Sequence, residues 1–114
     1  MKSQRPRAAR YSFVATATLT DLESGQQTQQ STCDLSLFGC RVIPGNSIPI
    51  GSRVRVQIHH KGEYFEAWGR VVHDGPLKGV GVVFTKIEMQ CQLVLDDWIA
   101  TLRDQKTSRQ TVSE

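Results

Sequence analysis

The chain has 114 residues, the usual size of one domain with a single hydrophobic core. No apolar run approaches the roughly 20 residues needed to span a bilayer, so the sequence predicts neither membrane insertion nor a secretory signal. The formal net charge of +3 is concentrated in the first ten residues, which carry four basic side chains (Lys2, Arg5, Arg7 and Arg10) and no acidic one. Residues 11–114 hold 10 basic and 11 acidic side chains, a balance that excludes the broad positive field that attracts a nucleic-acid duplex.

Three cysteines, Cys33, Cys40 and Cys91, are odd in number and widely scattered, with no Cys-x-x-Cys spacing. This pattern is typical of buried, reduced thiols rather than of a disulfide framework. We therefore expect a cytoplasmic protein.

The first structured segment is predicted to be a β-strand that begins at Tyr11. Apolar residues recur at every second position from Tyr11 to Leu19, which is the period of a half-buried strand. A polar turn at Asp21–Gly25 follows, and Gln26–Thr32 is predicted as the returning strand of a hairpin. Because this strand is rich in Thr and Gln, we expect it at an edge of the sheet, mostly facing solvent.

A second hairpin is predicted further along the chain. Apolar residues alternate from Val54 to Ile58 and again on one face of residues 65–71, with a turn at Lys61-Gly62-Glu63 between the two runs. A last alternating run covers Gly79–Phe84. About six short strands at close spacing predict a mostly β fold that closes into a barrel.

Only the C-terminal part of the chain has a helical pattern. Cys91, Leu95, Trp98 and Leu102 recur at three- and four-residue steps, which predicts an amphipathic helix over Glu88–Arg103 that covers one mouth of the barrel. The predicted organisation is a basic N-terminal arm (1–10), a barrel with its helix (11–103) and a polar, disordered tail (104–114).

The most informative segment is Asp34-Leu35-Ser36-Leu37-Phe38-Gly39, between the second and third predicted strands. It matches every fixed position of an Asp-x-Ser-x-x-Gly motif, and here the sequence resembles the PilZ family. The resemblance covers Arg10 to Leu102, with a basic arm, the motif, the segments 48–52, 69–72 and 79–84, and a terminal helix in the family's order. It implies a six-stranded antiparallel β-barrel with a C-terminal α-helix.

For function, the resemblance implies a non-enzymatic receptor for the bacterial second messenger cyclic di-GMP, with no other cofactor. The family uses arginines of the arm together with the motif turn, which in this chain are Arg5, Arg7, Arg10, Asp34, Ser36 and Gly39. An arginine fork can pair with a phosphate or with O6 and N7 of guanine, and a carboxylate can accept hydrogen bonds from guanine N1 and N2. Ser36 is expected to add a donor or acceptor, and Gly39 to permit unusual backbone dihedrals and a close approach of the backbone to the ligand.

The arm departs from the family pattern, in which two arginines are spaced Arg-x-x-x-Arg. When Tyr11 is aligned with the start of the first strand, Arg10 matches the second arginine and the first falls on Pro6. Because an extended chain advances about 3.3 Å per residue, the side chain of Arg5 or Arg7 can still reach the same ligand. We expect the bound ligand to order the arm and so change a surface that an unidentified partner protein reads.

Two other functions remain open. The offset arginine favours a PilZ-like interaction adaptor that has lost or weakened cyclic di-GMP binding and acts through its barrel face or helix. A barrel that binds single-stranded nucleic acid is opposed by the charge balance of residues 11–114, so we expect neither DNA nor RNA as a partner. Tyr64 and Trp68 fall opposite the apolar face of their strand, so we expect them to be exposed and to mark a partner surface.

No motif points to catalysis or to a metal. His59 and His60 are neighbours in a predicted strand and point to opposite faces, so they cannot chelate one ion. His73 and Asp74 have the residue types of an acid–base pair, but no nucleophile motif accompanies them and a Gly-Pro turn follows, so we predict a loop position for both. We expect neither an enzyme nor a metal site.

Overall fold

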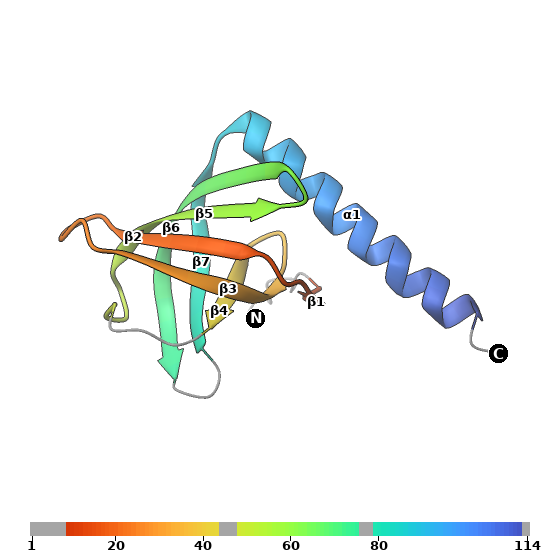
Figure 1. Cartoon of the computed structure of the whole chain (residues 1–114), viewed down its shortest axis with the longest axis horizontal. Helices are drawn as coiled ribbons and strands as arrows, with labels where there is room; N and C mark the ends of the chain where they lie inside the picture. The colour runs from red at the N-terminus through yellow and green to blue at the C-terminus, as the bar shows by residue number, and fades with distance from the viewer. Residues whose placement is uncertain (1–8, 44–47, 76–78, 113–114) are drawn as a thin grey trace, which may run out of the picture.

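A computed structural model describes residues 9–43, 48–75 and 79–112, with the backbone alone at 74–75 and 106–112. In chain order the elements are β1 (Tyr11–Ser12), β2 (Thr16–Asp21), β3 (Gln27–Leu35), β4 (Gly39–Ile43), β5 (Arg53–His60), β6 (Glu63–Gly75), β7 (Gly79–Ile87) and α1 (Met89–Val112). Strands β3, β2, β5, β6, β7 and β4 are antiparallel neighbours in that order, and β4 pairs back onto β3 (Figure 1). This closed six-stranded barrel with a C-terminal helix confirms the predicted fold class.

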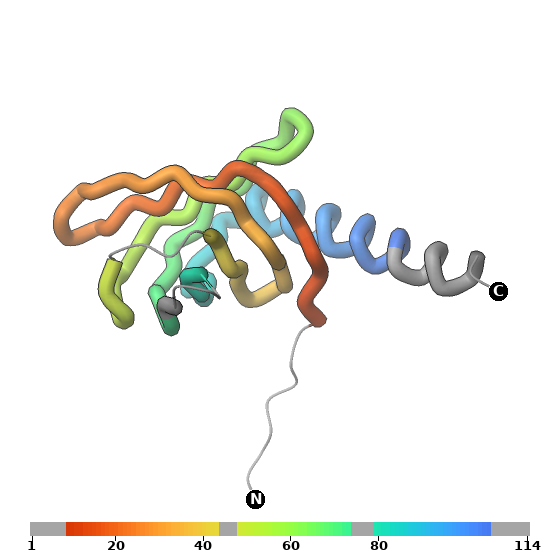
Figure 2. Tube along the Cα trace, turned by 60° about the horizontal axis from the view of Figure 1, so that its bottom comes forward, coloured from red at the N-terminus to blue at the C-terminus, as the bar shows by residue number. Residues whose placement is uncertain are grey.

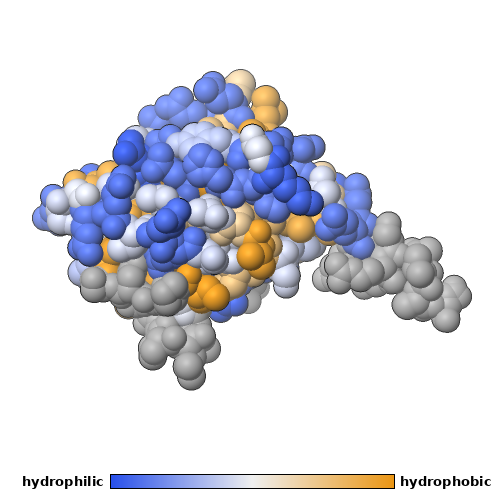
Figure 3. All heavy atoms as spheres, viewed as in Figure 1, coloured by the Kyte–Doolittle hydropathy of each residue, from blue (hydrophilic) through white to orange (hydrophobic). Residues whose placement is uncertain are grey.

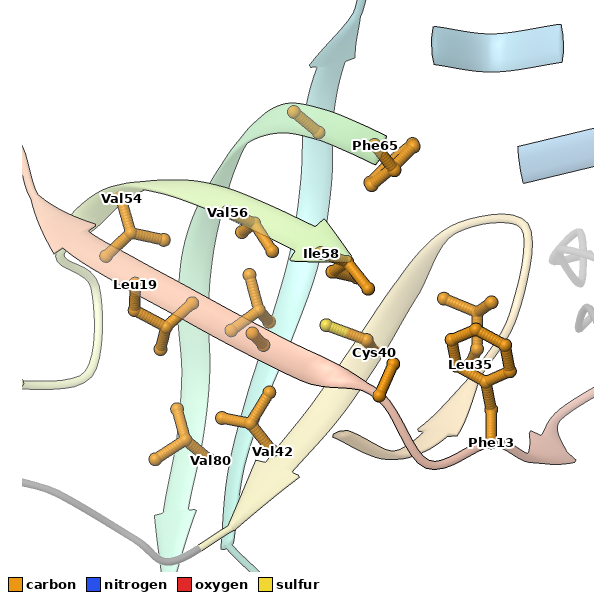
Figure 4. Close-up of a cluster of buried hydrophobic side chains, with 14 of the residues drawn as sticks. Phe13, Leu19, Leu35, Cys40, Val42, Val54, Val56, Ile58, Phe65 and Val80 are labelled. Carbon is orange, nitrogen blue, oxygen red and sulfur yellow. The ribbon is translucent and has the colours of Figure 1, made fainter. Parts of the chain in front are cut away.

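The barrel interior is filled by the apolar residues of the alternating runs. Val54, Val56 and Ile58 of β5 are fully buried, as is Phe65 of β6, and their side chains point toward those of the other strands (Figure 4). Between these two strands the chain reverses in two residues, Lys61 and Gly62, which have φ values of 50° and 82°. Positive φ at both central residues is typical of the tight turn whose twist matches that of a β-hairpin.

The predicted first strand is interrupted. Phe13, Ala15, Ala17 and Leu19 are buried on one face as expected, but the segment divides into β1 and β2, with residues 13–15 between them. The hydroxyl of Thr32, on β3, accepts a hydrogen bond from the Ala15 amide (2.9 Å) and donates one to the Phe13 carbonyl (2.6 Å). The side chain thus takes the place of a backbone partner where the two segments separate.

β3 is not an edge strand, so this expectation was wrong. It pairs with β2 on one side and with β1 and β4 on the other, because closure of a barrel gives each strand two neighbours. Gln30 and Thr32 are buried, whereas Gln29 and Ser31 face solvent. The face of the molecule seen in Figure 3 is mostly hydrophilic, with small, separate apolar patches.

α1 packs across one end of the barrel. Leu95, Trp98 and Ile99 are buried, and the Trp98 ring lies 5.2 Å from that of Phe13 and 6.1 Å from that of Phe65, measured between centroids. The helix continues to Val112, beyond the predicted end at Arg103 (Figure 1). Its coloured part in Figure 2 leads away from the barrel. Residues 104–112, for which the sequence predicted a disordered tail, have a helical backbone in the structure. Once a helix is anchored, each further residue adds a hydrogen bond at low cost, and this stretch contains neither Gly nor Pro.

The helices within the described ranges include none that is both long and apolar enough to cross a membrane.

Candidate functional site

The candidate site lies on the outside of the barrel, where β3 is flanked by β1 and β4. Asp34 is opposite Ser12 of β1 on one side and opposite Arg41 of β4 on the other. Cys40 and Val42, on either side of Arg41, are buried, so Arg41 and its partner Asp34 face outward. In a regular strand, residues two positions apart face the same side. The register of the β3–β4 pair shifts between Thr32 and Asp34, and this irregularity lets Thr32 point into the core while Asp34 faces outward.

Two arginines share the Asp34 carboxylate. Arg41 Nη2 lies 2.6 Å from Oδ2, and Arg10 Nη1 lies 3.3 Å from Oδ1. The side chain of Asp34 is only 11% exposed, whereas that of Arg10 is 58% exposed. A hydrogen bond with the Cys33 side chain and then the charge of Asp34 raise the pKa of the Arg41 guanidinium. Arg41 is therefore the close, fixed partner of the carboxylate, and Arg10 is the partner that solvent or a ligand can reach.

Ser36 closes the turn between β3 and β4. Its hydroxyl oxygen accepts hydrogen bonds from the backbone amides of Phe38 (3.1 Å) and Gly39 (3.2 Å), and its own amide donates to the Gly39 carbonyl (2.9 Å). A serine in this arrangement substitutes for a backbone group in a tight turn. Leu37 and Phe38, at the tip, are exposed beside the site. The direct contact between Ser36 and a ligand that we expected stays a prediction.

Gly39 is required for a reason other than the expected one. Its φ is not positive, since Gly25, Gly51, Gly62 and Gly79 are the glycines of the described residues with positive φ. A Cβ at Gly39 would instead lie 2.2 Å from the Val82 carbonyl oxygen on β7. The expectation of unusual dihedrals was wrong. The glycine allows β4 to approach β7 and so fixes where the turn emerges.

Beneath the turn, Cys40 points into the core. Burial, the largest cause, and the charge of Asp34 raise the pKa of its thiol to about 12. The side chain therefore remains a neutral thiol at physiological pH and serves as an apolar floor for the site.

The described residues do not include all the predicted site. Arg5 and Arg7 lie outside them, so their roles stay predictions. Arg10, just before β1, is brought to Asp34 because β1 pairs with the end of β3. The structure thus joins Arg10 and the Asp34–Gly39 turn, which are separated by more than twenty residues of chain.

Two residues of this surface were absent from the predicted site. Arg41 was not among the predicted site residues. Its position between the apolar residues Cys40 and Val42, which are buried, could have identified it as an outward-facing residue next to the motif. His73 and Asp74 both lie in β6 rather than in a loop, so that prediction was wrong. The exposed imidazole of His73 covers Gly81 of β7, where a Cβ would meet Nε2 at 2.3 Å. Gly81 is in turn the cross-strand partner of Arg41. Asp34 of β3, Arg41 of β4 and His73 of β6 therefore lie in one row, with Gly81 of β7 between Arg41 and His73.

Comparison with known proteins agrees with this architecture. A family model described as PilZ domain matches residues 4–101. A search of curated proteins found no match.

Solved structures with the same fold include the PilZ domain of CeSA from a cellulose-synthesizing bacterium, with a TM-score of 0.68 and 15% identity over 83% of this chain and 98% of that one. The Bacillus subtilis inhibitor of motility, MotI/DgrA, has a TM-score of 0.68 and 15% identity over 93% of this chain and 53% of that one. The PilZ domain of YcgR from Escherichia coli, solved with c-di-GMP, has a TM-score of 0.67 and 16% identity over 96% of this chain and 99% of that one.

Proposed function

Because this chain belongs to the PilZ domain family, we propose that it is a cyclic di-GMP receptor and adaptor whose ligand site is formed by the N-terminal arm and the Asp34–Gly39 turn. PilZ domains are regulatory and binding modules rather than enzymes. The observation that carries the proposal is the 3.3 Å contact between Arg10 of the arm and Asp34 of the turn. The fold shared with a YcgR domain that was solved with c-di-GMP supports the same ligand class.

The chemistry of the site suits a cyclic dinucleotide. Arg10 is exposed and can exchange its long contact with Asp34 for a bidentate pair with a phosphate or a guanine edge. Asp34 then has one carboxylate oxygen free to accept hydrogen bonds from guanine N1 and N2, while Arg41 continues to hold the other oxygen. Binding would thus exchange one charged pair for two charge-assisted contacts.

The rest of the arm supplies the second guanidinium in this proposal. The family position for it is occupied by Pro6, and Arg5 and Arg7 lie one residue to either side. When one of them reaches the ligand, residues 1–10 become ordered against the barrel, and a partner protein reads the new surface.

Isothermal titration with cyclic di-GMP tests the proposal. We expect binding by the unchanged chain and a loss of about ten- to a hundredfold in affinity for Arg10→Ala and Asp34→Asn, the range set by one charge-assisted hydrogen bond. Arg103→Ala, on the exposed part of α1, is the matched control and should bind normally. Arg5→Ala and Arg7→Ala, compared with each other, identify the second arginine. Absence of heat and of any thermal shift in the unchanged chain at high ligand concentration would reject the proposal.

The second candidate is an adaptor of the same fold that no longer binds the nucleotide, or binds it weakly. Proline at the first arginine position is the observation that favours it, since proline has no donor with which to contact a phosphate. A folded chain with no response to cyclic di-GMP, together with a partner retained in pull-down, would select this function.

A further inference from the structure

A second charged surface lies on the outside of β5, β6 and β7. Arg53 of β5 is directly opposite Arg70 of β6, and Trp68 of β6 is directly opposite Lys86 of β7. These four residues line one pocket of about 410 Å³. In the closed order of strands, β5 and β6 are opposite the β3–β4 pair that carries Asp34. This basic pocket is therefore separate from the candidate nucleotide site.

The basic pocket holds positive charge without a matching negative charge. Like charges directly opposite each other in an antiparallel pair are destabilising. No carboxylate of the described residues lies within ion-pairing distance of Arg53, Arg70 or Lys86. Arg70 is held in place, since its Nη1 donates a hydrogen bond of 2.9 Å to the Gly51 carbonyl. An anion bound here would relieve the repulsion between the two arginines.

The pocket also has an apolar side. Trp68 and Leu22 contribute to its lining, and the Arg55 guanidinium carbon lies 6.0 Å from the centre of the Trp68 ring. Arginine near an aromatic face in this range makes a favourable cation–π contact, which fixes the orientation of the indole. A ligand with both carboxylates and an apolar group therefore fits this surface better than a simple inorganic anion.

A groove continues from the pocket toward α1. It has a volume of about 370 Å³, shares Trp68 and Lys86 with the basic pocket, and is bounded by Tyr64, Cys91 and Val94. Glu66 and Glu88 also line it. Their charges would repel the phosphates of a nucleic-acid strand that ran along the groove, and they would equally repel the carboxylates of a peptide. The acidic residues of a peptide therefore fit only the basic pocket, and its apolar side chains fit the groove, where they would meet Val94 and the two aromatic rings.

We propose that the basic pocket and this groove form a docking surface for an acidic peptide segment of a partner protein. The carboxylates of the segment lie against Arg53, Arg70 and Lys86, and an apolar or aromatic side chain enters the groove beside Trp68. This inference goes beyond nucleotide binding and does not depend on it, because none of its residues belongs to the candidate nucleotide site.

Fluorescence polarisation tests the proposal with a short fluorescein-labelled peptide in which a run of glutamates is followed by phenylalanine and leucine. Controls are the same peptide with glutamine for glutamate and a labelled single-stranded oligonucleotide. Arg70→Glu is the decisive variant, since the new carboxylate faces Arg53 and should support the fold while repelling the peptide. We expect its affinity for the acidic peptide to fall at least about tenfold, and Arg103→Glu, which lies in neither pocket, to bind normally.

Two-dimensional NMR shows which surface of the chain the peptide contacts. The chain has two tryptophans, and the indole NH of the buried Trp98 already donates to Glu63 at 2.7 Å. The peptide should shift the Trp68 indole signal and leave that of Trp98 in place. Preferential binding of the oligonucleotide would overturn the proposal in favour of a nucleic-acid surface. Absence of peptide binding, or an equal loss in both glutamate variants, would also overturn it, whatever the outcome with cyclic di-GMP.

Discussion

Arg41 and Asp34 lie directly opposite each other across the β3–β4 pair, with 2.6 Å between Nη2 and Oδ2, while Arg10 approaches the other oxygen at 3.3 Å. The two arginines therefore differ in kind. Arg41 belongs to the barrel and compensates a carboxylate that is almost excluded from water. Arg10 belongs to the arm and is largely exposed. Stability and ligand binding should accordingly depend on different arginines.

Arg41→Ala should lower the free energy of unfolding by about 1–3 kcal/mol, because it leaves a poorly solvated carboxylate without its close partner. Arg10→Ala should change it by less than about 1 kcal/mol, as is usual for an exposed ion pair. Urea unfolding of both variants measures the difference. Equal effects would contradict the distinction between a structural and a ligand-facing arginine.

Gly39→Ala should destabilise the barrel by about 3 kcal/mol or more, since its Cβ would overlap the Val82 carbonyl and neither strand can move without breaking pairs. Gly25→Ala is the matched control. Gly25 has a φ of 79° but open space around its Cβ position, so only backbone strain of about 1–2 kcal/mol is expected. A larger cost at Gly25 than at Gly39 in thermal or urea unfolding would show that contact with β7 is not what requires the glycine.

Ser36→Ala should cost about 1–3 kcal/mol, because the amides of Phe38 and Gly39 lose their acceptor, a hydroxyl on a buried residue, at a partly buried position. Hydrogen exchange at these two amides should become faster than in the unchanged chain. Ser24 provides the comparison, since its hydroxyl accepts one bond from the Gln26 amide in an exposed turn. Ser24→Ala should have the smaller effect, and the reverse order would contradict the role given to Ser36.

Acid should weaken the contact between the barrel and α1 through His60. The centroid of its ring lies 4.5 Å from that of Phe13 and 5.6 Å from that of Trp98. Burial, with a smaller contribution from the charge of Lys61, lowers the pKa of the His60 imidazole. The folded chain thus binds the proton less readily than the unfolded chain, whose His pKa is about 6.5. Stability associated with His60 is fully present above that pH and is lost as the pH falls through the lower folded value.

Urea unfolding at about pH 7.5 and about pH 5 measures this effect. The loss on acidification should be smaller in His60→Phe, which keeps an aromatic ring without a titrating group. His59→Gln, on the exposed neighbour, should retain the full loss. An unchanged pH dependence in His60→Phe would refute the assignment.

The sequence was sufficient for the features that depend on local alternation. Val54, Val56 and Ile58 are buried because every second residue of a strand faces the same side, and this period is visible without any structure. Asp34 and Gly39 were predicted as site residues from the motif that resembles that of the PilZ family, and their contacts with a ligand stay predictions. Leu95 and Trp98 were correctly assigned to the buried side of the helix.

Features that depend on contacts between distant residues were not predictable. The hydroxyl of Thr32 bonds the backbone at the break between β1 and β2. A glycine is required at position 39 because a Cβ there would overlap the carbonyl of Val82, which is more than forty residues away in sequence. The barrel itself was predicted, but the strands that close it were not: β4 pairs back onto β3, and this long-range pairing makes β3 an interior strand despite its polar composition. The pairing of Arg41 with Asp34 required the register of β3 and β4, including the irregularity at Cys33.

The hydroxyl of Thr32 has a consequence for the arm. It holds the amide of Ala15 and the carbonyl of Phe13 just before the chain enters β2, and so it determines the direction in which the preceding residues run. Valine at this position would have nearly the same shape but would leave both backbone groups unpaired in the core. The reach of Arg10 toward Asp34 is thus set by an uncharged side chain two residues before the aspartate, on the opposite face of the barrel wall.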